Sequence, residues 1–246
     1  MTSSFWILLT AIFLLAGLVK GVIGMGLPTV AMGLLAIVLP PAEAAAILVV
    51  PSLVTNVWQL LAGPRFGALA RRLWPMMLGV TVGTIAGAGL IASDASGVAE
   101  AGLGVALAVY AVVGLSGFKM VVVPHQEKWL APTIGATTGL VTGATGVFVI
   151  PAVPYLQAIG LERDELIQAL GLSFTVSTLA LALGLLRVEA WQTSSIGISL
   201  LALVPALAGM QLGQVMRRRI APKTFRTVFF AGLLLLGLYL ALRGLA

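Results

Sequence analysis

The sequence predicts an all-α polytopic membrane protein that consists of two inverted repeats of five helical elements, each with a broken, re-entrant helical hairpin. Three observations predict this fold class: the composition, the lengths of the apolar runs, and a match between the two halves of the chain. Of the 246 residues, 60% are hydrophobic and 9% are charged, whereas soluble domains have about 25% charged residues. The mean hydropathy is +1.11. Such a chain has too little polar surface to face water on all sides, so its main solvent must be lipid.

Apolar runs bounded by charges, proline or glycine define the elements. The first half contains the runs Phe5–Gly24, Pro28–Leu39, Ala42–Ala62, Leu73–Ala92 and Ala99–Phe118. The second half contains Leu130–Val147, Pro151–Gly160, Leu166–Leu186, Gln192–Met216 and Thr224–Leu242. A helix needs about 20 residues to cross the bilayer core. The second run of each half is too short for this and follows a glycine-containing break, so both are expected to be re-entrant half-helices.

The two halves match each other. The segment GLVKGVIG, which starts at Gly17, resembles GLVTGATG, which starts at Gly139, at an offset of 122 residues (139 − 17). The same offset continues without gaps and brings Glu43 onto Glu165 and Arg65 onto Arg187. Charged residues are rare in this chain, so their agreement favours a duplication. The expected organisation is a first repeat over 1–118, a cytoplasmic linker over 119–129 and a second repeat over 130–246.

Basic loops set the expected orientation, because cytoplasmic loops of membrane proteins carry an excess of lysine and arginine. One such loop carries Arg65, Arg71 and Arg72, and another carries Arg217, Arg218, Arg219, Lys223 and Arg226. Counting spans from these loops places the turn 40–43 outside and its equivalent 162–165 inside, which makes the halves inverted. Asp94 and Glu100 then lie outside, and both termini are expected on the periplasmic side of a bacterial inner membrane. The net charge of +6 is explained by these loops, so no nucleic-acid partner is expected.

The two breaks are the first candidate for a binding site. Gly24 and Gly26 interrupt the first hairpin and Gly146 interrupts the second, at a depth where irregular backbone must line a cavity or be buried in protein. Paired broken helices in corresponding positions of two halves are typical of transporter binding sites. Pro28 and Pro151 are expected in the first turns of the half-helices. The N-terminal ends would then point into the site, where free N–H groups and the helix dipole favour anions.

Lys20 lies one helical turn before the first break. A charge at the bilayer centre costs about 2.5–3.5 kcal/mol or more, and intramembrane charges usually serve function. The alternative roles are snorkelling to an interface and pairing with a buried acid. The acidic residues all map to loops or span ends, so Lys20 either loses its proton when desolvated or binds an anion, and we favour the role in substrate binding.

Small polar side chains are expected to line the rest of the site. Asn56 and Gln59 carry amides that need several partners, and Thr142 is the repeat equivalent of Lys20. Thr145 follows within a turn, and Thr178 is the repeat equivalent of Asn56. The alternative for each hydroxyl is a bond to the carbonyl four residues earlier in its own helix. The candidate substrate-binding residues are Lys20, Gly24, Gly26, Asn56, Gln59, Thr142, Thr145, Gly146 and Thr178.

The pattern GLxxGxxG followed by a proline occurs in Gly17–Pro28 and Gly139–Pro151. It resembles the sulfite exporter TauE/SafE family, also called the sulfonate uptake permease family, and the resemblance covers nearly the whole chain. It implies two inverted repeats and the transport of small sulfur-containing anions such as sulfite, sulfoacetate or other organosulfonates. The family's broken-helix motif maps onto Gly17, Gly21, Gly24, Gly26, Pro28, Gly139, Gly143, Gly146 and Pro151.

We therefore expect a secondary carrier or facilitator that moves such anions by alternating access, with no catalytic residue, cofactor or metal. The chain has no cysteine and one histidine, which leaves no set of ligands for a zinc site. The alternatives are a transporter of another small organic or inorganic anion and, ranked below it, a structural membrane subunit. A cation carrier and an intramembrane enzyme rank lower, because no carboxylate maps deep in the membrane and no serine is placed to meet Lys20. The partners are the anion and the lipid bilayer, with a homo-oligomer left open.

Overall fold

The described residues of the computed structural model are all in helices or short connections. The model describes residues 3–92, 97–117, 120–191, 193–217, 219 and 222–246. Five residues discussed above lie outside this part of the chain: Asp94, Phe118, Lys119, Gln192 and Arg218. The helices are α1 (Ser3–Ile23), α2 (Leu27–Leu35), α3 (Pro41–Leu61), α4 (Phe66–Ala92), α5 (Val98–Ser116), α6 (Pro124–Thr145), α7 (Ala152–Ala158), α8 (Arg163–Arg187), α9 (Thr193–Met216) and α10 (Pro222–Leu245).

Each run predicted from the sequence contains one helix, so the all-α fold class is confirmed. Seven helices in the described part of the chain are long and apolar enough to cross a membrane. Helices α2 and α7 have 9 and 7 residues and are too short, as predicted. Helix α6 has 22 residues but does not reach the apolarity of the seven, because the charged residues of its first turns are followed by five threonines.

Two predicted helix starts are wrong. Helix α4 begins at Phe66 rather than Leu73, so Arg71 and Arg72 lie within a helix and not in a loop. Helix α6 begins at Pro124, inside the segment predicted as a linker. In both cases the helix continues beyond the apolar run, because hydropathy marks where a chain enters lipid and not where its helical hydrogen bonds begin.

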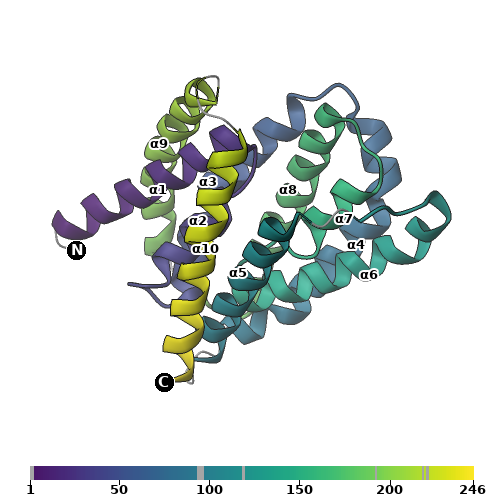
Figure 1. Cartoon of the computed structure of the whole chain (residues 1–246). Helices are drawn as coiled ribbons and strands as arrows, with labels where there is room; N and C mark the ends of the chain where they lie inside the picture. The colour runs from purple at the N-terminus through teal and green to yellow at the C-terminus, as the bar shows by residue number, and fades with distance from the viewer. Residues whose placement is uncertain (1–2, 93–96, 118–119, 192, 218, 220–221) are drawn as a thin grey trace.

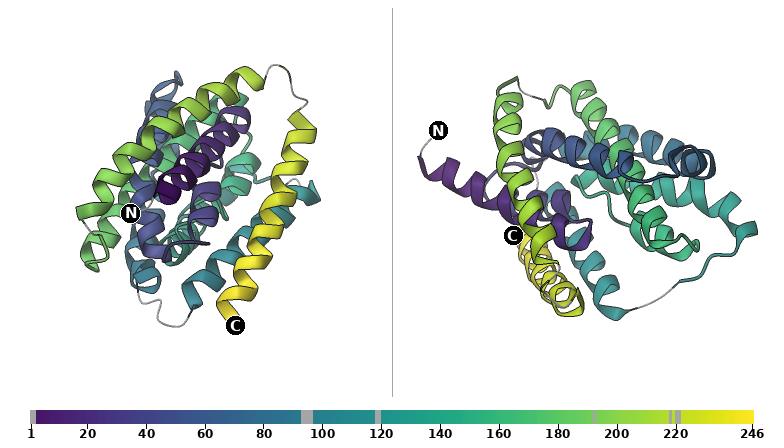
Figure 2. Two further views of the ribbon diagram at one scale, coloured as in Figure 1. Left: turned by 90° about the vertical axis from the view of Figure 1, so that its left-hand side faces the viewer. Right: turned by 90° about the horizontal axis from the view of Figure 1, so that it is seen from above.

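Glycines bring two pairs of helices into close parallel contact. A Cβ atom added at Gly17 would lie 2.1 Å from the Ala206 carbonyl oxygen, and one at Gly21 would lie 2.2 Å from that of Met210. Positions increase together along both helices, so α1 and α9 run parallel. In the same way Gly139 and Gly143 of α6 lie against the backbone of α4. Figures 1 and 2 show α9 beside α1 and α4 beside α6.

Two further pairs run antiparallel. Gly171 of α8 lies against Leu60 of α3, whereas Gly63, just after α3, lies against Gln168, which comes earlier in α8. Helix α5 packs against α10, with Gly97 near Gly244, as Figure 1 shows along the length of the yellow helix.

In terms of the predicted repeat, α3 and α5 each pair with their own equivalent in the other half, α8 and α10. Helices α1 and α6, which are also equivalents, each pair with a helix of the opposite half. A two-fold axis between the halves would produce this set of contacts.

Candidate functional site

The first break begins where α1 ends at Ile23. Gly24 and Gly26 have φ angles of 86° and 102°, in the left-handed region that favours glycine. Helix α2 then starts at Leu27 with Pro28 in its first turn, as predicted. The N–H groups of Met25, Gly26 and Thr29 donate to no carbonyl of the described residues. The break therefore offers free backbone donors at the N-terminal end of a half-helix, which is the arrangement that binds anions.

Lys20 is buried beside this break, with 4% of its surface exposed. Its ammonium donates to the Thr55 hydroxyl at 3.2 Å and to the Asn56 side-chain oxygen, both on α3. No carboxylate of the described residues forms an ion pair with it, so snorkelling and acid pairing do not describe its position. An ammonium has three donors, and two neutral acceptors leave its positive charge uncompensated.

Helix α3 presents these acceptors through an irregularity at Pro51. Proline has no N–H group, so the Ile47 carbonyl loses its partner within the helix. The Ser199 hydroxyl of α9 donates to that carbonyl at 2.6 Å and accepts the Val50 N–H at 3.1 Å. One turn later the Thr55 hydroxyl donates to the Pro51 carbonyl at 2.7 Å, which leaves its oxygen free to accept from Lys20. Helix α9 thus fixes, through Ser199, the segment of α3 whose Thr55 and Asn56 accept hydrogen bonds from Lys20.

Six buried polar groups on α2, α3 and α8 have no hydrogen-bond partner among the described residues, and α3 packs against both α2 and α8. Leaving such a group unpaired costs about 1–3 kcal/mol, so these groups are candidates for contacts with a polar ligand. The groups are the Asn56 Nδ2, the Gln59 Oε1 and the hydroxyls of Thr29, Ser52, Ser173 and Ser177, from α2, α3 and α8. Most of these groups can donate, which suits a ligand rich in oxygen acceptors.

The second break differs from the first. Gly146 ends α6 with a φ of 71°, as predicted, but Pro151 caps α7 instead of lying in its first turn. Pro151 and Pro154 carry no N–H, while Val153 and Tyr155 donate theirs to the carbonyls of Val149 and Pro151. The N–H groups of Phe148, Val149, Ile150 and Ala152 donate to no carbonyl of the described residues, so free backbone donors occur at the second break as well.

The predicted threonines of the second half bond within their own helices. The hydroxyls of Thr142, Thr145 and Thr178 donate at 2.7 Å to the carbonyls four residues earlier. The Thr145 oxygen also accepts the Val147 N–H at 3.2 Å and so closes the end of α6. These are the alternative roles considered from the sequence, and they leave each hydroxyl able to accept but without a free hydrogen.

Contacts across the halves bring the two breaks near each other. A Cβ atom placed on Gly146 would lie 2.9 Å from the Met32 sulfur of α2. The Tyr110 hydroxyl of α5 donates to the Met25 sulfur in the first break, at 3.3 Å. Gly102, on the same helix, lies against the Thr145 methyl group. Helix α5 therefore touches both breaks. Ser199 and Tyr110 are the contacts that the predicted site residues did not include.

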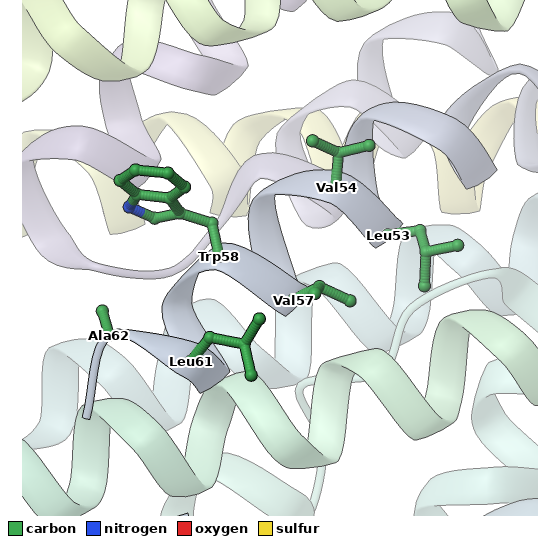
Figure 3. A pocket seen from close by; sticks show the side chains of 6 residues that line it. All are labelled: Leu53, Val54, Val57, Trp58, Leu61 and Ala62. Carbon is green, nitrogen blue, oxygen red and sulfur yellow. The ribbon is translucent and has the colours of Figure 1, made fainter. Parts of the chain in front are cut away.

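A hollow of about 620 Å³ lies on the outer side of α3. Figure 3 shows the residues that line it: Leu53, Val54, Val57, Trp58, Leu61 and Ala62. It contains none of the buried polar groups, and its apolar lining suits lipid rather than an anion. No group of three acidic, histidine or cysteine residues in the described chain could hold a metal ion.

The fold and site define a class of protein: a multi-pass helical membrane protein with two interrupted helices and an interior ammonium beside free donors. Comparison with known families agrees with this class. The sulfite exporter TauE/SafE family model matches residues 9–240, and the chain belongs to this family, which is a family of membrane transporters for sulfur-containing anions. No match to the chain was found among curated proteins or among solved structures.

Proposed function

We propose that the protein is a secondary carrier or facilitator that moves sulfite, sulfoacetate or another small organosulfonate across a bacterial inner membrane. The observation that carries the proposal is the Lys20 ammonium, which is buried, bonded to neutral oxygens and adjacent to the free amides of the first break. Such a site has net positive charge and donors, and it lacks an internal carboxylate. Its natural ligand is a small anion with several oxygen atoms.

In this proposal Lys20, Gly24 and Gly26 bind the anion with charge and backbone donors. A Cβ atom on Gly24 would meet no atom within 4 Å, so the backbone there is open to a ligand. The Asn56 Nδ2, which has no partner in the described chain, supplies a further donor. The more distant wall of the proposed site is formed by Gln59, Thr142, Thr145, Gly146 and Thr178.

Alternating access follows from the proposed inverted repeat. The contacts α3–α8 and α5–α10 join equivalent helices, and α1–α9 and α4–α6 exchange partners between halves; these pairings support two repeats related by a two-fold axis. Such an architecture has two arrangements of similar energy, each open to one side. The orientation proposed from the loop charges puts both termini in the periplasm, which a protease-cleavable tag at either terminus would test.

Transport into proteoliposomes of labelled sulfite and sulfoacetate tests the function. We expect wild-type protein to accumulate label, Lys20→Met to lose at least tenfold in rate, and Lys20→Arg to keep part of it, because only arginine retains the charge. Lys128→Met, at an exposed lysine of α6, is the matched control and should transport normally.

Three results would contradict the proposal in different ways. Normal transport by Lys20→Met would remove Lys20 from the site. Transport of a different small anion, with neither sulfur compound carried, would assign the site to that anion. No transport of any anion by folded wild-type protein would favour a structural subunit.

A further inference from the structure

The tips of the two half-helices are held in the same way at the far ends from the breaks. The Arg243 Nη1 donates to the Ile37 carbonyl just after α2, at 2.7 Å. The Arg72 Nη2 donates to the Ile159 carbonyl just after α7, at 2.8 Å. Ile37 and Ile159 are 122 residues apart (159 − 37), which is the repeat offset, whereas the two arginines are 171 apart (243 − 72). The same contact is therefore made twice by arginines that the duplication does not relate.

Each arginine is also bound by a glutamate in the first turn of another long helix. Arg243 of α10 lies 3.2 Å from the Glu100 carboxylate of α5, without hydrogen-bond alignment. Arg72 of α4 binds Glu127 of α6 through two bonds of 2.9 and 2.6 Å. A cation at the C-terminal end of a helix is favoured by the helix dipole. We call each set of three, Arg243–Glu100–Ile37 and Arg72–Glu127–Ile159, a tip tie.

The two tip ties lie at opposite ends of α3. The first lines a hollow of about 410 Å³ together with Pro41, where α3 begins. From there α3 runs for 21 residues, about 30 Å, and a short connection leads into α4 with Arg72. Asn56, which binds Lys20, lies between these ends. Each tie thus stands between the buried site and one face of the molecule.

A tie at a tip controls the break, because a short helix moves as a rigid body. Helix α2 has 9 residues, about 14 Å, and joins Gly26 at one end to the tied segment at the other. Its Met32 touches the second break at Gly146. A displacement of the tip is therefore passed on to the free amides beside Lys20.

We propose that Arg243 with Glu100, and Arg72 with Glu127, are the two gates of this protein, each closing the Lys20 site toward its own end. Release of one tie lets its half-helix move and admits solvent and substrate from that side. The Arg72 gate is the stronger, because its ion pair is bidentate and the Val122 N–H also holds the Ala158 carbonyl at the end of α7, at 2.9 Å. The identity of the substrate that passes the gates rests on the proposed function, whereas the opening of the gates does not.

The chain has no cysteine, so a single introduced thiol can report access to the site. Ser52→Cys is a small change at a fully buried position with an unpartnered hydroxyl, one turn before Asn56. We would label it with a membrane-impermeant thiol reagent from either side of oriented vesicles, with and without Glu100→Gln or Glu127→Gln. Glutamine keeps the size of glutamate but removes the charge that holds the arginine.

We expect Glu100→Gln to speed labelling about fivefold from the Arg243 side alone, and Glu127→Gln to speed it by at least as much from the Arg72 side alone. The matched control is Glu189→Gln, which removes the charge of an exposed glutamate that belongs to neither tip tie. Arg243→Lys and Arg72→Lys provide a second test if a glutamine variant fails to fold. A lysine lacks the fork needed to bind both partners, so we expect the same sidedness.

Labelling rates equal to those of Glu189→Gln, or equal acceleration from both sides, would overturn the gates and leave the ties as structural contacts. The transport assay is separate from this test. Side-specific labelling without sulfur-anion transport would refute the proposed function but support the gates. If Lys20→Met loses transport and no variant shows side-specific labelling, the proposed function is supported and the gates are refuted.

Discussion

The contact between α1 and α9 makes a sharp prediction, because it places Lys20. A Cβ atom at Gly21 would lie 2.2 Å from the Met210 carbonyl oxygen and 2.9 Å from the Gly213 Cα. Ordinary contacts of this kind need about 3.4 Å, so Gly21→Ala must push the two helices apart by about 1 Å. Both clashing atoms belong to backbone, which cannot rotate away as a side chain can.

The cost follows from that displacement. Overpacking a tight contact costs about 1–3 kcal/mol, and here it also moves the neighbouring Lys20 relative to Asn56. We expect Gly21→Ala to lower the midpoint of thermal unfolding in detergent and to reduce transport. Gly232→Ala on α10 is the matched control, because a Cβ there meets no atom within 4 Å. That change should be neutral or stabilising by up to about 1 kcal/mol, since alanine is the better helix former.

The thermal midpoint of Gly21→Ala relative to wild type tests whether α1 and α9 are in close contact. If Gly21→Ala unfolds at the wild-type temperature or above, the two backbones are not in the close contact described, and the placement of Lys20 by α9 falls with it. Loss of transport with unchanged stability would instead show that the helices separate at little cost and that the lysine position alone matters.

Two further predictions concern single hydrogen-bonding side chains. Ser199→Ala leaves the Ile47 carbonyl and the Val50 N–H without their partner, so we expect about 1–3 kcal/mol of destabilisation by thermal unfolding. Ser199→Thr, which keeps the hydroxyl, should recover part of the loss, and equal loss in both variants would contradict the role of the hydroxyl. Gln168→Leu removes bonds of 2.8 and 2.7 Å to the carbonyls of Leu60 and Gly63. It should destabilise by at least as much, and a thermal midpoint within 1 °C of wild type would refute the importance of this cap on α3.

Much of the fold follows from local sequence. Apolar runs and the residues that break them are short-range signals, and each of the ten predicted runs contains a helix. Glu43 and Glu165, which match at the repeat offset, lie in the first turns of α3 and α8. The starts of α4 and α6 were not predictable from hydropathy, because the residues that extend these helices, such as Arg72 and Glu127, are polar and belong to the tip tie at α7.

The site was predictable in part. Lys20 was identifiable because a charge inside an apolar run needs a reason, and Asn56 because an amide needs several partners. Pro51 within a predicted helix signals that Ile47 lacks a donor, but nothing local names Ser199, which is 149 residues from Val50. The same holds for the tip ties, since their arginines and carbonyls come from helices that meet only in the folded chain.

The residues of the second half that correspond to Lys20 and Asn56 explain why the charge of the site comes from the first half. At the position of Lys20 the second half has Thr142, and at Asn56 it has Thr178; both threonines give their hydrogen to their own helices. The free amides do not follow this division, because the N–H groups of Phe148, Val149, Ile150 and Ala152 at the second break also donate to no carbonyl of the described residues. In the proposed function, a two-fold scaffold thus supplies two similar gates and free amides at both breaks, while the ammonium comes from one half alone. An alternating-access carrier needs this combination, since one site must serve both sides.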